Sequence, residues 1–147
     1  MDVSGCGCPP TSVPGQVHHV FLNVRDLARS REFYARLMPR LGYPGAVDYP
    51  QVCGFLSPTG SVWIKPVGVP FATDAFHKDR VGLCEVAFAA ASRADVDALH
   101  RELAASGVTI LDPPREYPEY VPGYYAVFFA DPDGIKLEFV HIPPSAG

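Results

Sequence analysis

The sequence contains an internal repeat, and a repeated unit restricts the possible folds more than any other feature of the chain. Residues 17–24 (VHHVFLNV) and residues 83–90 (LCEVAFAA) both have the β-branched and apolar character of strands. Each is followed by a segment whose apolar residues recur at helical spacing, at residues 27–41 and 93–106. Both halves therefore begin with a predicted strand and a predicted helix.

The ends of the two predicted helices also correspond. Asp26 and Ser92 precede the helices and are residue types that cap helix starts. Gly42 and Gly107 follow them and are suited to the left-handed conformation that ends a helix. A shift of 66 positions places Asp26 on Ser92, so the two helices are predicted to occupy equivalent places.

A second correspondence joins two predicted hairpins. Residues 55–65 (FLSPTGSVWIK) and 129–139 (FADPDGIKLEF) both carry Pro-x-Gly between strand-like runs, a combination that forms tight turns. This alignment has an offset of 74 positions. Each half thus reads strand, helix and further strands, which predicts an α+β fold of two βαβββ modules forming an eight-stranded open barrel around a cleft.

The module boundaries follow from composition. Residues 1–16 are rich in Gly, Pro and Ser and are predicted to be a flexible leader that carries Cys6 and Cys8 as free thiols. The first module is predicted at 17–67 and the second at 81–143, with a linker at 68–80 between them and one structural domain overall. Cys84, within an apolar run, is predicted to be a core residue.

Composition excludes several classes of function. The chain has 147 residues, of which 48% are hydrophobic and 19% charged, as expected for a packed globular protein. A net charge of −4 without a basic run argues against a nucleic-acid partner. No apolar stretch approaches the roughly 20 residues of a membrane span, and a signal sequence is not evident, so we expect a cytoplasmic protein.

Alternation along the strands predicts which side chains face away from the helices. In the first strand Val20, Leu22 and Val24 are expected to pack on the helix. The opposite side of that strand then carries His19, Phe21 and Asn23. Phe21 and Asn23, which share this face with His19, are candidates to line a pocket.

The repeat predicts which residues of the other strands lie on the corresponding face. The 66-residue offset makes Glu85 equivalent to His19, and the 74-residue offset makes Ile64 equivalent to Glu138. With Ile64 on the open side, alternation predicts that its neighbour Trp63 belongs to the core. Four positions are therefore expected to face one concavity: His19, Ile64, Glu85 and Glu138.

Two carboxylates in an apolar concavity repel each other and are costly to bury unpaired. A divalent cation among His19, Glu85 and Glu138 would relieve this, and oxygen-rich ligands suit Mn²⁺, Fe²⁺, Zn²⁺ or Ni²⁺. A proton retained on one Glu, or an ion pair between a protonated His19 and one Glu, would also relieve it. The residue types leave these three outcomes open.

Two motifs resemble a known family. The segment HHVFLNVRDLARSREFY near the start and the segment GYYAVFFADPDGIKLE near the end are similar to motifs of the vicinal oxygen chelate superfamily. That superfamily includes glyoxalases, extradiol dioxygenases, and fosfomycin and bleomycin resistance proteins. The resemblance covers residues 17–143, nearly the whole chain.

The resemblance implies particular roles for these residues. His19 lies seven residues before Asp26, where the family has its first metal ligand, and Glu138 follows the D-P-D-G motif at another ligand position. Glu85 stands where a His is common. Ile64 stands where glyoxalase-like members have Glu or Gln, and Ile cannot coordinate a metal.

Two functions are consistent with this resemblance. The first is a divalent-metal-dependent lyase or isomerase of the glyoxalase type that chelates vicinal oxygens of a small substrate, with Glu138 or Glu85 as general base. The alternative is a metal-free protein that binds an antibiotic or natural product. In both, the expected ligand-contacting residues are Phe21, Asn23, Ile64 and Tyr124, the last from a tyrosine-rich segment that could cover the site. Exposed strand edges predict a homodimer.

Overall fold

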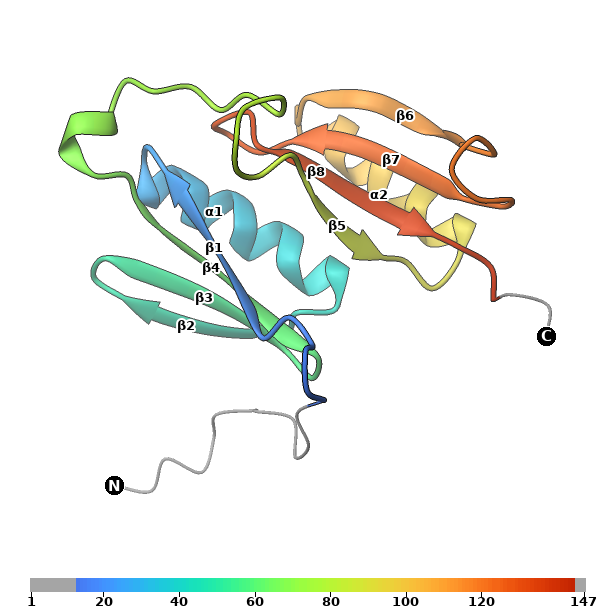
Figure 1. The fold of residues 1–147 in the computed structure, drawn as a ribbon, viewed down its shortest axis with the longest axis horizontal. Helices are drawn as coiled ribbons and strands as arrows, with labels where there is room; N and C mark the ends of the chain where they lie inside the picture. The colour runs from blue at the N-terminus through green and yellow to red at the C-terminus, as the bar shows by residue number, and fades with distance from the viewer. Residues whose placement is uncertain (1–12, 145–147) are drawn as a thin grey trace. The chain divides into compact units, whose positions relative to one another are not determined.

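A computed structural model of the chain describes residues 13–144 and divides into two compact units, with the boundary between Thr73 and Asp74 (Figure 1). The boundary falls inside the predicted linker at residues 68–80. Residues 1–12 of the predicted leader, which include Cys6 and Cys8, lie outside the described residues.

The described part of the first unit contains one α-helix, two short 3-10 helices and four strands. Its elements are β1 (His19–Val24), α1 (Leu27–Leu37), the 3-10 helix η1 (Met38–Leu41), β2 (Gly45–Tyr49), β3 (Val52–Ser57), β4 (Gly60–Pro66) and the 3-10 helix η2 (Val69–Phe71). The strands form one sheet in the order β1-β4-β3-β2, in which β1 and β4 are parallel and the other pairs antiparallel.

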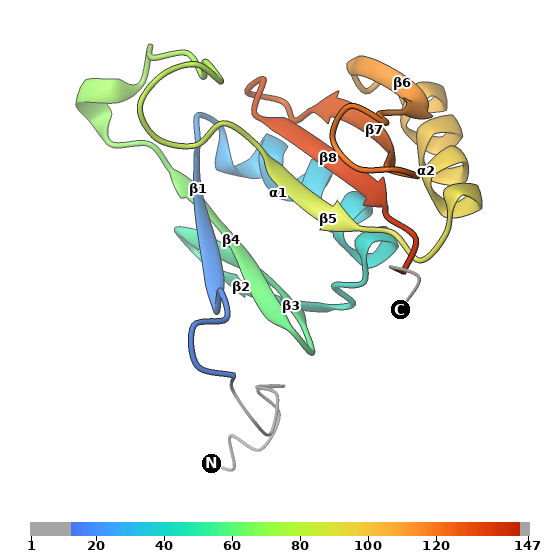
Figure 2. The same cartoon turned by 45° about the vertical axis from the view of Figure 1, so that its right-hand side comes forward.

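The second unit repeats this arrangement. Its elements are β5 (Val86–Ala89), α2 (Arg93–Ala105), β6 (Ile110–Glu116), β7 (Tyr125–Ala130) and β8 (Lys136–His141). Its sheet has the order β5-β8-β7-β6, with β5 parallel to β8, and these strands can be followed in Figure 2. The predicted α+β class and the two βαβββ modules are confirmed.

The caps of both helices are as predicted. The Asp26 side chain accepts a hydrogen bond from the Arg29 backbone N–H, and the Ser92 side chain accepts one from Asp95. Gly42 and Gly107 have φ angles of 90° and 74°, where a side chain would be strained. The predicted first helix becomes 3-10 over its last four residues, where Pro39 cannot donate the backbone hydrogen bond of an α-helix.

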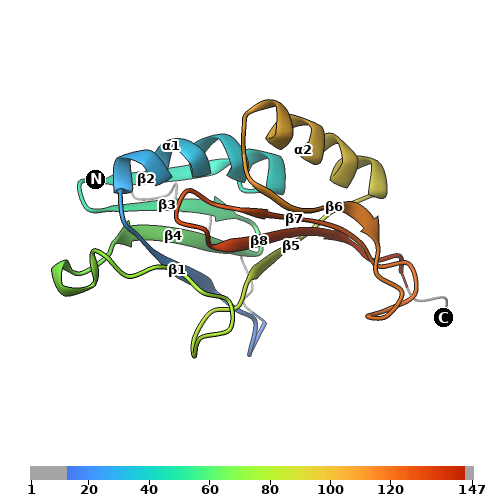
Figure 3. The same cartoon turned by 90° about the horizontal axis from the view of Figure 1, so that it is seen from above.

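Each helix covers one face of its own sheet, as Figure 3 shows for each unit. In the first unit Leu22 and Ile64, which are register partners, are buried on the same side as Tyr34 and Leu37 of α1. In the second unit the corresponding layer is formed by apolar residues: Phe88, Val96, Leu99, Leu103, Val127, Phe129, Leu137 and Phe139. We call the side of each sheet that lies away from its helix the open face.

Strand register corrects one predicted equivalence. Phe21 pairs with Trp63 in the first unit, and Ala87, which the repeat equates with Phe21, pairs with Glu138 in the second. Trp63, and not Ile64, is therefore the counterpart of Glu138. Ile64 has no exposed surface and lies on the α1 side.

The correction has a simple cause in the two hairpins. Phe55 pairs with Val62 in the first unit, whereas Phe129 pairs with Leu137 in the second, so the second turn is one residue longer. Gly134, at φ 85°, lies in this turn. A shift of one residue moves every following side chain to the other face of a strand. The prediction that Trp63 belongs to the helix-packed core was wrong for this reason.

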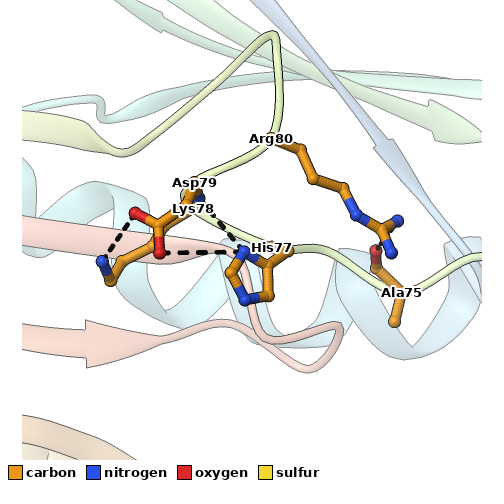
Figure 4. Close-up of polar contacts among 5 residues, drawn as sticks. All are labelled: Ala75, His77, Lys78, Asp79 and Arg80. Atoms are coloured by element: carbon orange, nitrogen blue, oxygen red, sulfur yellow. Dashed lines mark hydrogen bonds and ion pairs between the residues drawn. The ribbon is translucent and has the colours of Figure 1, made fainter.

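The prediction that Cys84 is a core residue was also wrong. Cys84 is exposed, and β5 begins two residues later at Val86. The preceding segment is held by its own polar groups: Lys78 pairs with Asp79 at 2.8 Å, and Arg80 donates to the Ala75 carbonyl at 3.3 Å (Figure 4). The backbone N–H of Asp79 also donates to His77.

We predict that Gly54 is required by the indole of Trp63. A Cβ atom at Gly54 would lie 2.6–2.7 Å from three ring atoms of Trp63, closer than packed atoms can approach. Gly54→Ala should lower the free energy of unfolding by about 1–3 kcal/mol in urea denaturation. The loss should largely disappear when Trp63→Ala is also present, because the ring is then gone. An equal loss in both backgrounds would contradict this packing.

Candidate functional site

The open face of the first unit carries a row of rings. His19 meets Phe21 edge to face, with ring centroids 5.7 Å apart, and Phe21 stacks on Trp63 at 5.8 Å and an interplanar angle of 22°. The rings follow from strand alternation: Leu22 and Ile64 take the helix side, so the neighbouring side chains must face away.

The indole of Trp63 is held in place from several directions. Its Nε1–H donates to Ser61 Oγ at 2.9 Å, and the absence of a side chain at Gly54 lets the ring lie against β3. Phe21, by contrast, keeps 47% of its surface exposed. A fixed indole beside a half-exposed phenyl ring forms a rigid aromatic surface.

The first strand also presents polar groups near this row. The Nδ1 atoms of His18 and His19 lie 3.0 Å apart, so one ring donates and the other accepts. Both imidazoles are exposed. Asn23, the remaining predicted ligand-contacting residue of this strand, is also exposed. His19, Phe21 and Asn23 therefore share the open face, whereas Ile64 does not.

The open face of the second unit is built around a buried carboxylate. Glu138 keeps only 1% of its surface exposed, although strand alternation directs its side chain away from α2. The hydroxyl of Tyr124 donates a short hydrogen bond to Glu138 Oε1. Tyr124 also packs against a buried cluster formed by Tyr117, Ala126, Phe128 and Val140.

The loop between β6 and β7 is rich in tyrosine and supplies the Tyr124 hydroxyl that binds Glu138. The Tyr117 N–H donates to the Tyr124 carbonyl at 2.8 Å and closes the loop. The ring of Tyr117 stacks on Tyr120 at 5.5 Å and meets Tyr124 and Phe128 edge to face. Tyr125 does not join this cluster, because its hydroxyl donates to Asp97 of α2 at 2.7 Å.

The second carboxylate of this unit is paired with a lysine. Lys136 Nζ lies 2.7 Å from Glu85 Oε2, and the same ammonium group is 4.3 Å from the centroid of the Phe128 ring. Lys136 lies two residues before Glu138 on β8, so both side chains project from the open face. Strand alternation accounts for the position of Lys136 on this face, but no local sequence pattern indicates that its partner is Glu85.

These contacts set the protonation behaviour of the site. Burial raises the pKa of Glu138 above its usual value and is opposed by the hydrogen bond from Tyr124; the charge of Glu85 raises this pKa further and Lys136 lowers it. The pKa of Tyr124 is also raised, first by burial and then by its hydrogen bond to the Glu138 carboxylate. Carboxyl groups whose pKa is raised by burial and by a neighbouring charge are common among catalytic acids and bases.

The predicted metal ligands are divided between the units, with His19 in the first and Glu85 and Glu138 in the second. Within either unit, the described residues include no group of three or more His, Cys, Asp or Glu side chains that could hold a metal ion. Trp63 stands at the strand position equivalent to Glu138, and an indole N–H can only donate. Of the predicted ligands, Glu85 is paired with Lys136, and the set of His19, Glu85 and Glu138 stays a prediction.

The sequence matches the model of a known protein superfamily over most of its length. The family model of the Glyoxalase/Bleomycin resistance protein/Dioxygenase superfamily matches residues 16–139. The chain belongs to this superfamily. The resemblance noted from the two sequence motifs is thereby confirmed.

Individual proteins are similar to most of the chain. The uncharacterised protein YqjT of Bacillus subtilis (strain 168) is 35% identical over 124 residues, which are 84% of this chain and 97% of YqjT. A candidate glyoxalase from Bacillus halodurans is 34% identical, with a TM-score of 0.76 over 88% of this chain and 97% of its own. A glyoxalase/bleomycin resistance protein from Albidiferax ferrireducens T118 is 28% identical, with a TM-score of 0.70 over 86% and 98% of the two chains.

Among the described residues, no helix is both long and apolar enough to cross a membrane.

We predict that Glu138 makes the stability of this superfamily member depend on pH. Folding raises the pKa of Glu138, so this side chain contributes most to the free energy of unfolding at pH values below its pKa in the unfolded chain. That contribution is lost as the pH rises through its pKa in the folded protein. Glu138→Gln removes that loss, so the variant should gain stability relative to the wild type as pH rises, by about 1.4 kcal/mol for each pH unit of raised pKa. Urea denaturation from pH 4 to pH 8 measures this difference.

A second variant tests the cause of this shift. Tyr124→Phe removes a hydrogen bond that lowers the pKa of Glu138, so in this background the effect of Glu138→Gln should grow. An effect of Glu138→Gln that stays constant with pH would show that burial does not perturb this carboxyl.

Proposed function

We propose that this superfamily member binds a small planar organic molecule on the aromatic open face of its first unit, without a resident metal ion. One observation carries the proposal: Trp63 occupies the strand position that Glu138 occupies in the second unit, and it stacks on the half-exposed Phe21. The position that supplies a carboxylate in one half of the fold thus supplies an aromatic ring in the other.

The physical argument is preorganisation. Trp63 is fixed by Ser61 and by the space at Gly54, so little side-chain freedom is lost when a ligand arrives. Phe21 exposes an apolar ring to water, and covering this surface is favourable. His19 and Asn23, on the same face, can exchange hydrogen bonds with polar groups at the edge of a ligand.

The second candidate is the metal-dependent lyase or isomerase implied by the family resemblance. In this role Glu138, with Glu85, would act as the acid–base group, and the divalent metal would supply Lewis-acid activation of the substrate oxygens. The observation that favours it is the buried Glu138 beneath Tyr124, since buried carboxyls with a raised pKa are common at catalytic sites. It requires that Glu85 leave Lys136.

Homodimer formation and a cytoplasmic location accompany both candidates and stay predictions. β1 and β2 are edge strands of the first sheet, and β5 and β6 of the second. Edge strands with free backbone groups are suited to pairing with a second copy of the chain.

We predict that planar aromatic compounds change the fluorescence of Trp63, which is the single tryptophan of the chain. Titration with a panel of aromatic antibiotics, including a bleomycin, should give saturable quenching. Phe21→Ala should weaken binding by up to about tenfold, because one stacking partner is removed.

Phe71→Ala is the matched control. Phe71 is an exposed phenylalanine of the same unit, in η2 rather than in the ring row, and its loss should leave the affinity unchanged. Equal weakening by both variants, or no saturable quenching by any compound, would contradict the proposed aromatic site.

A further inference from the structure

We propose that Lys136 is the resident cation of the second unit's carboxylate site, and that its ammonium group keeps divalent metal ions away from Glu85 and Glu138. The inference deepens the metal-independent part of the proposed function, on which it rests. It concerns residues of one unit only, and the aromatic row of the other unit takes no part in it.

The ion pair is placed where it has more effect than a surface contact. Lys136 Nζ lies 2.7 Å from Glu85 Oε2, and the two side chains keep only 23% and 32% of their surface exposed. Partial removal from water lowers the local dielectric constant and strengthens the attraction between the charges. The pair is thus less screened than one between fully exposed side chains.

An aromatic ring fixes the direction of the lysine. The ammonium group lies 4.3 Å from the centroid of Phe128, within the range of a cation–π contact. Phe128 is the register partner of Glu138 across β7 and β8, and it is buried. The ring therefore holds Lys136 on the open face beside both carboxylates.

The charge balance of the site argues for the same conclusion. Two ionised carboxylates on this face would be stabilised by a neighbouring cation, and Lys136 supplies one without a metal. Glu138 is further stabilised by the hydroxyl of Tyr124. A divalent ion bound to Glu85 would have to displace the ammonium group or lie close to it, and the repulsion between two cations opposes this.

The test is a titration of the purified full chain with Co²⁺ alone, followed by calorimetry and by visible absorption. Lys136→Met removes the charge but keeps an unbranched apolar stem against Phe128, and Lys136→Arg keeps the charge. We expect weak, substoichiometric Co²⁺ binding by the wild type and by Lys136→Arg. Lys136→Met should bind Co²⁺ at least about tenfold more tightly, because two carboxylates are left without a cation.

A double variant tests whether Glu85 is the side chain that coordinates Co²⁺. When Glu85→Gln is added to Lys136→Met, the gain in Co²⁺ affinity should be abolished. Stoichiometric Co²⁺ binding by the wild type, or no gain in Lys136→Met, would overturn the proposal. If circular dichroism shows that Lys136→Met is unfolded, Lys136→Gln is used in its place with the same expected gain.

The two proposals fail separately. Stoichiometric Co²⁺ binding by the wild type together with saturable quenching of Trp63 by aromatic compounds would remove the role of Lys136 and the metal-free part of the proposed function, and would keep the aromatic site. Weak Co²⁺ binding by the wild type without any quenching of Trp63 would remove the aromatic site and keep the role of Lys136.

Discussion

Strand alternation across the two parallel pairs, β1–β4 and β5–β8, determines what each open face contains. Leu22 and Ile64 must be buried beneath α1, so Phe21 and Trp63 have to face the other way. In the second unit the burial of Leu137 and Phe139 directs Glu138 to the open face by the same rule. A slip of one residue would put the indole against the helix and expose Ile64, so the core holds the register.

The two open faces therefore differ in chemistry although the modules share one topology. The first presents rings, with Trp63 fixed and Phe21 half exposed. The second presents a buried carboxylate that is stabilised by Tyr124, with a neighbouring Glu85 that is neutralised by Lys136. Metal coordination in the second unit would require Glu85 to exchange Lys136 for a metal ion, and in the first unit the indole N–H of Trp63 can only donate.

Local patterns in the sequence were enough to predict the fold, but the parts that depend on register and on distant contacts could not be predicted. Helix caps at Asp26 and Ser92 depend on residues near each other in the chain, and with the turn signals they identified the two modules. Aligning the hairpins by Pro-x-Gly ignored the extra residue of the second turn, and that error exchanged the roles of Ile64 and Trp63. The ion pair between Lys136 and the residue before β5 joins segments far apart in the sequence, and no local pattern signals it.

The most direct test of the account is a crystal structure of the full chain grown with excess Ni²⁺ or Zn²⁺, with diffraction data collected on both sides of the metal absorption edge. The account predicts no anomalous peak at Glu85 or Glu138, with Lys136 Nζ on the Glu85 carboxylate and the Trp63 ring on Phe21. An anomalous peak coordinated by His19, Glu85 and Glu138, with Lys136 displaced, would contradict it.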